Sequence, residues 1–150
     1  MRIIPAFLFL ILFPFLVGAQ CSDISIETLQ VVSKAEDSAK EAKILSLGFD
    51  LHLQTTRNKD TLRVYDKCWV TNEGARTIYD QKIIWNQTKS NITFLTLNMD
   101  LSERLRAALD ERHPSEEQRR KTITGKMFRY TFGIETWDGR DYYYLIVAVK

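Results

Sequence analysis

The stretch that most constrains the fold of this chain is residues 126–149, where two segments rich in β-branched and aromatic residues flank Asp138 and Gly139. An Asp-Gly pair between two such segments predicts a β-hairpin with a two-residue turn. A turn of this length fixes the strand register and places Trp137 opposite Arg140. One face of the hairpin is then apolar at every position, and we expect that face to be buried. Its residues are Tyr130, Phe132, Ile134, Tyr143, Leu145 and Val147.

The opposite face of the hairpin combines aromatic side chains with a carboxylate, which is typical of a recognition surface. Tyr144 lies across from Gly133 in this register, where an aromatic ring can cover the bare backbone. The alternative is that a helix or a second sheet covers this face and makes its aromatic residues part of a core. The candidate binding residues on this face are Trp137, Tyr142, Tyr144 and Glu135.

Residues 1–19 have the layout of a secretory signal peptide. A basic second residue precedes an apolar run, and Val17 and Ala19 occupy the positions that a signal peptidase reads. We expect cleavage before Gln20, which leaves residues 20–150 as a single α+β domain. The protein is therefore expected to be secreted or periplasmic.

Two alternatives to a cleaved signal peptide are less favoured by the residues. A membrane anchor needs roughly 20 consecutive apolar residues, and Pro14 interrupts the only apolar run of that kind. Bacterial lipoproteins carry a small residue before the acylated cysteine, whereas Gln20 precedes Cys21 here. We expect no membrane span in the mature chain.

The chain contains two cysteines, Cys21 and Cys68. Export places them in an oxidising compartment, where such a pair usually forms a disulfide; two unpaired thiols are the alternative. A metal site is not indicated, because His52 and His113 stand alone rather than at paired ligand spacing. We predict a Cys21–Cys68 disulfide, no metal and no cofactor.

Upstream of the hairpin, the spacing of apolar residues predicts helices where the period is close to 3.6 and strands where it is close to 2. The strand that contains Asp66 alternates imperfectly, and a β-bulge near Asp66 would restore the pattern. Pairing Asn86 with Asn91 gives a second hairpin with one apolar face. The predicted helices are residues 22–43 and 100–113, and the predicted strands are residues 44–54, 61–71, 77–85 and 91–97.

Short connections between strands make the sheet antiparallel, since parallel pairs need a long crossover. The order of elements predicts an α+β fold with a single antiparallel sheet of about six strands, an N-terminal helix and one inserted helix. The alternative architecture is a β-sandwich or small barrel with peripheral helices.

Asn86 and Asn91 each begin an Asn-x-Thr triplet, the acceptor pattern for N-glycosylation. Both flank the tip of the predicted hairpin, where exposure is expected. They are candidate glycosylation sites if the source is eukaryotic.

The sequence contains no nucleophile or phosphate-binding motif. Glu135, Asp138 and Asp141 cluster at the final hairpin, and paired carboxylates are the machinery of glycosidases. The charge balance of the chain, +2 with the signal peptide included, gives no electrostatic case for nucleic acid. We expect a non-enzymatic binding or interaction module for a protein or a glycan; the alternative is a carbohydrate-active hydrolase.

Overall fold

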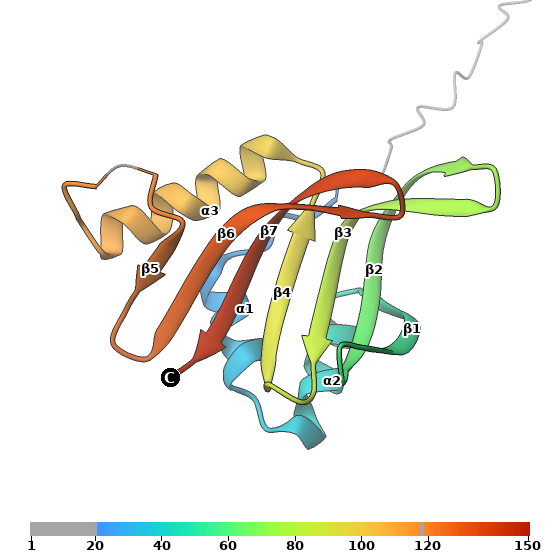
Figure 1. The fold of residues 1–150 in the computed structure, drawn as a ribbon, viewed down its shortest axis with the longest axis horizontal. Coiled ribbons are helices and arrows are strands. Elements are labelled where there is room, and N and C mark those ends of the chain that lie inside the picture. Colours follow the sequence, from blue (N-terminus) through green and yellow to red (C-terminus); the bar gives the residue numbers. More distant parts are fainter. Residues whose placement is uncertain (1–20, 118) are drawn as a thin grey trace, which may run out of the picture.

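The computed structural model describes residues 21–117 and 119–150, so the predicted signal peptide lies outside the described residues. Three helices and seven strands form an α+β fold with one antiparallel sheet (Figure 1). The strand order across the sheet is β1-β2-β3-β4-β7-β6-β5. The elements are α1 (Ile26–Lys34), α2 (Asp37–Ser46), β1 (Asp50–Arg57), β2 (Asp60–Glu73), β3 (Arg76–Asn86), β4 (Asn91–Thr96), α3 (Met99–Arg112), β5 (Thr122–Thr124), β6 (Phe128–Trp137) and β7 (Arg140–Val149).

The N-terminal region differs from the prediction of one helix followed by a strand from residue 44. Ser25 caps α1 by accepting a hydrogen bond from the backbone N–H of Thr28, and extended backbone at Ala35 then separates α1 from α2. Helix α2 continues through Ser46, so the apolar alternation read as a strand begins in a helix. Gly48, at a φ of +82°, ends the turn that follows α2 by donating to the carbonyl of Leu45. Gly48 therefore marks the end of the helical segment. The alternating leucines around it had favoured a strand in the sequence-based prediction.

Both predicted hairpin registers are confirmed. Trp137 pairs with Arg140 across the last turn, and Asn86 pairs with Asn91 across the turn between β3 and β4. The sheet has seven strands rather than about six, because the short strand β5 pairs with β6 in addition.

The predicted bulge lies farther along β2 than expected. The register between β2 and β3 shifts between Trp69 and Thr71, beside Cys68, which has a φ of +62°. Asp66 itself stays in regular pairing with Lys82. A bulge had been predicted to move the Asp66 carboxylate to the solvent side of the strand. The carboxylate is instead buried and neutralised by the ammonium group of Lys82.

The main core lies between the three helices and one face of the sheet, which we call the helix-covered face. Figure 1 shows α1 and α2 behind the central strands and α3 beside β5 and β6. Each helix contributes fully or nearly fully buried apolar side chains, and the six strands β2 to β7 supply the opposite side of this core. Ile134 is an exception to the predicted burial of the last hairpin. It is 64% exposed, because β6 extends past the helices toward its tip. Tyr143, its partner across the hairpin, is half-buried.

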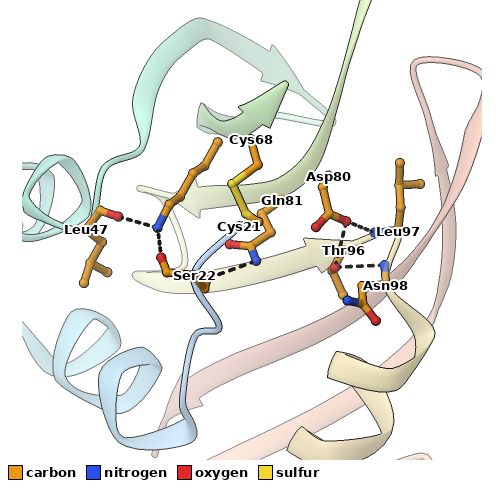
Figure 2. The surroundings of a disulfide bond; sticks show 10 residues. Cys21, Ser22, Leu47, Cys68, Asp80, Gln81, Thr96, Leu97 and Asn98 are labelled. Atoms are coloured by element: carbon orange, nitrogen blue, oxygen red, sulfur yellow. Dashed lines mark hydrogen bonds between the residues drawn. A yellow bond between two sulfur atoms is a disulfide. The ribbon is translucent and has the colours of Figure 1, made fainter. Parts of the chain in front are cut away.

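The predicted disulfide between Cys21 and Cys68 is confirmed, with a Cα–Cα distance of 5.7 Å (Figure 2). It fastens the segment before α1 to the irregular part of β2. Closing a loop of this length stabilises the fold by about 4 kcal/mol on the chain-entropy model. The bond is compatible with an oxidising, extracellular compartment. Within the described residues, no helix has both the length and the apolar character needed to cross a membrane.

Candidate functional site

The face of the sheet opposite the helices carries the four candidate binding residues, and we call it the open face. A small apolar cluster lies there, made of side chains from the strands and from Leu97. The β6–β7 hairpin bends across the ends of β4 and β3, so that its tip closes over part of this cluster (Figure 1). The cluster contains Leu62, Val64, Ile84, Leu95 and Tyr142, with Leu53, Leu97, Trp137 and Tyr144 packed against it.

A buried charge cluster holds the hairpin tip in place. Lys82 is fully buried on β3. Its Nζ lies 2.8 Å from Oδ1 of Asp66 and 3.0 Å from Oδ2 of Asp138 in the hairpin turn. His52 approaches the same cluster from β1, with Nδ1 at 3.3 Å from Oδ2 of Asp66. The charges are therefore paired with one another, as buried charges generally must be.

Tyr142 belongs to this closed part of the open face. Its side chain is fully buried, and its hydroxyl donates to the carbonyl of Tyr79 at 2.6 Å. Burial raises the pKa of the Tyr142 hydroxyl above its ordinary value, and the charges of Asp138, Asp66 and Asp80 add to this effect. In this position Tyr142 supports the fold and has no surface to offer a partner.

The other three candidate residues remain accessible in part. Trp137 and Tyr144 are half-buried, and Tyr144 covers Gly133 as the register predicts: a Cβ on Gly133 would lie 2.5 Å from the Tyr144 hydroxyl. Glu135 is also half-buried, and its carboxylate lies 3.3 Å from Nη1 of Arg57 on β1. The open face thus presents two partly exposed aromatic rings beside the ion pair of Glu135 and Arg57.

The carboxylates considered for glycoside hydrolysis are each engaged in the structure. Asp138 pairs with buried Lys82, Glu135 pairs with Arg57, and Asp141 accepts a hydrogen bond from Thr136 at 2.5 Å. Among the described residues, no group of three or more His, Cys, Asp or Glu side chains could hold a metal ion.

The two candidate glycosylation asparagines lie at the β3–β4 turn, both half-buried. The side-chain nitrogen of Asn86 donates to Asp60 at 2.9 Å, and its oxygen accepts from the backbone of Lys89. In the same triplet, the Thr88 hydroxyl accepts from the backbone N–H of Thr61. The Asn86 triplet therefore organises two neighbouring turns, whereas the part of the chain that the structure describes offers the Asn91 side chain no hydrogen bond.

Sequence reasoning did not identify the residues that close the open face. Lys82 lies within the predicted strand of residues 77–85 and was not singled out, and Asp66 was interpreted as an interruption of the alternating pattern. Their opposite charges on neighbouring strands were the available signal, but the β2–β3 register was needed to place them together.

The open face therefore combines two partly accessible aromatic rings and an ion pair with a charge cluster that holds the hairpin tip. Comparisons with protein-family models, with curated proteins and with solved structures found no match for this chain.

Proposed function

We propose that this chain is an exported, non-enzymatic binding module that recognises a protein or a glycan through the open face of its sheet. The observation that carries the proposal is the position of Trp137 and Tyr144 on a face that none of the three helices covers. Aromatic rings with partial exposure provide large contact areas at low entropic cost, and this favours recognition.

The surroundings of these rings support binding over catalysis. Glu135 and Arg57 supply charges at the side of the aromatic pair, and such polar groups give a binding surface orientation and specificity. The buried Lys82–Asp66–Asp138 cluster keeps the hairpin tip fixed, so the surface is already formed before a partner arrives.

Export is part of the proposal and has separate support. The apolar N-terminal run and the small residues before Gln20 are typical of a cleaved signal peptide, and the Cys21–Cys68 disulfide suits an oxidising compartment. Intact-mass measurement of protein collected outside the cytoplasm tests this part. A mass that starts at Gln20 supports it, and a mass that retains residues 1–19 contradicts it.

The binding part is tested by screening the purified protein on glycan and protein arrays, then measuring each hit with a Trp137→Ala variant. We expect at least a tenfold loss of affinity, since an aromatic residue at the centre of an interface contributes strongly. The matched control is Ile134→Ala, on the same strand but with its side chain on the other face. Equal losses from both changes, with both variants folded, would contradict recognition by the open face.

A further inference from the structure

We propose that a polar cavity beside the disulfide binds a primary ammonium group, supplied by a small free amine or by a lysine side chain. The cavity has a volume of about 600 Å³, within the usual range for small-ligand sites. It is separate from the four candidate residues of the open face. The residues that line it are Cys21, Ser22, Asp23, Asp80, Gln81, Asn98 and Arg104.

The cavity lies beside β3, at the point where its neighbouring strand β4 ends. The pairing of β3 with β4 ends at Gln81 and Thr96, after which the chain leaves β4 and enters α3. The segment that carries the disulfide approaches from the other side, with Cys21 bonded to Cys68 (Figure 2). Polar side chains at this junction therefore line a space instead of packing beneath a neighbouring strand.

Asp80 gives the cavity a carboxylate without a counter-charge. Its Oδ1 accepts hydrogen bonds from the Thr96 hydroxyl at 3.2 Å and from the backbone N–H of Leu97 at 3.1 Å, as Figure 2 shows. These donors orient the carboxylate but carry no positive charge. None of the salt bridges within the described residues includes Asp80. A cationic donor is the partner that such a half-buried carboxylate prefers.

Gln81 provides an independent indication that a donor belongs here. Its side chain is 1% exposed, and its Nε2 donates to the carbonyl of Ser22 at 3.3 Å. Its Oε1 is buried and has no hydrogen-bond partner among the described residues. Buried polar atoms are nearly always satisfied, so a donor is expected beside Oε1 of Gln81. An ammonium group has three donors and no acceptor, which matches a carboxylate and an amide oxygen.

The remaining charges of the cavity favour the same ligand. Asp23 and Arg104 pair with each other at 2.6 Å and are both well exposed. Among the residues that line the cavity, these two charges cancel, which leaves the negative charge of Asp80. An anion or an uncharged alcohol would gain less from this lining than an ammonium group does.

The test is a titration of the disulfide-bonded protein followed by two-dimensional amide NMR. The probes are n-butylamine, its uncharged analogue n-butanol, and Nα-acetyl-lysine methylamide as a model of a lysine side chain. We expect saturable shifts around Asp80 and Gln81 with the two ammonium compounds and none with n-butanol. The tighter of the two identifies the source of the ammonium group. Absence of binding by both, which would mean that water alone satisfies Gln81, overturns the proposal.

Variants make the test specific to the cavity. Asp80→Asn keeps an Oδ1 acceptor for Thr96 and Leu97 but removes the charge, so affinity for the ammonium probe should fall at least tenfold. Asp50→Asn, an exposed carboxylate on β1, is the matched control and should change nothing. Because Asp80→Asn could also disturb the fold, Arg104→Gln is measured as well. It removes the one cation among the described residues that line the cavity and should tighten ammonium binding about threefold. Unchanged affinity in Asp80→Asn, or weaker binding in Arg104→Gln, overturns the proposal.

Discussion

The two faces of the sheet are stabilised by different interactions. On the helix-covered face, three helices bury a large apolar cluster against six strands. On the open face, a smaller apolar cluster is closed by the bent β6–β7 hairpin, which is held by the buried Lys82 and its two carboxylates. The first face gains its stability mainly from apolar area, and the second depends on a few specific contacts.

This difference is the reason for proposing the open face, and not the helix-covered face, as the recognition surface. On the helix-covered face, stability comes from burying apolar side chains, so aromatic residues there are removed from solvent. A hairpin fixed by charge pairs can instead leave Trp137 and Tyr144 half-buried and still hold them rigidly. A second ion pair, between Arg140 and Glu73, joins the hairpin tip to β2. It holds the pKa of the Glu73 carboxyl below its ordinary value.

The largest effect is expected from truncation on the helix-covered face. Phe94→Ala removes a ring that is 1% exposed and should lower the free energy of unfolding by about 3–5 kcal/mol. Tyr144→Ala on the open face should cost only about 1–2 kcal/mol, because part of that ring stays in water. Urea denaturation of both variants measures the comparison. Equal losses would show that the open face is as much a core as the other.

A somewhat smaller effect is expected from the charge cluster. Lys82→Met leaves Asp66 buried without its cation and should lower the free energy of unfolding by about 3 kcal/mol. Adding Asp66→Leu removes that uncompensated charge, and the double variant should return to within about 1 kcal/mol of the wild type. The same denaturation experiment measures both. If the double variant is no more stable than Lys82→Met, charge burial is not what makes the single change costly.

The smallest effect concerns alkaline pH. Because the pKa of Tyr142 is raised in the folded protein, its contribution to stability is complete below the pKa of about 10 in the unfolded chain. It is lost as the pH rises from there toward the higher folded value, by up to about 1.4 kcal/mol per pH unit. Stability measured between pH 9 and pH 11 should therefore fall more steeply in the wild type than in Tyr142→Phe. Parallel curves would indicate that Tyr142 ionises as easily in the folded state as in the unfolded one.

The sequence by itself determined the local features of this protein. The Asp138-Gly139 turn set the register of the last hairpin. The apolar alternation in the strands on either side of the loop 87–90 set the register of β3 and β4. Both registers depend on residues close together in the chain, so the turn residues and the apolar period are enough to predict them. The disulfide was also predictable, because the chain offers a single pairing of its two cysteines.

Other features were decided only by tertiary structure. The leucines of residues 45–53 alternate like a strand, yet α2 extends to Ser46 because helix packing buries Ile44 and leaves Leu45 exposed. The role of Tyr142 likewise depended on where the hairpin tip bends. Lys82 and Asp66 lie on different strands, and Asp138 lies in a third segment far along the chain. The apolar period and the secondary-structure propensities of the sequence report on residues that are close together in the chain. The charge pairs of Lys82 join segments that are distant in the chain and come together only when the sheet has assembled.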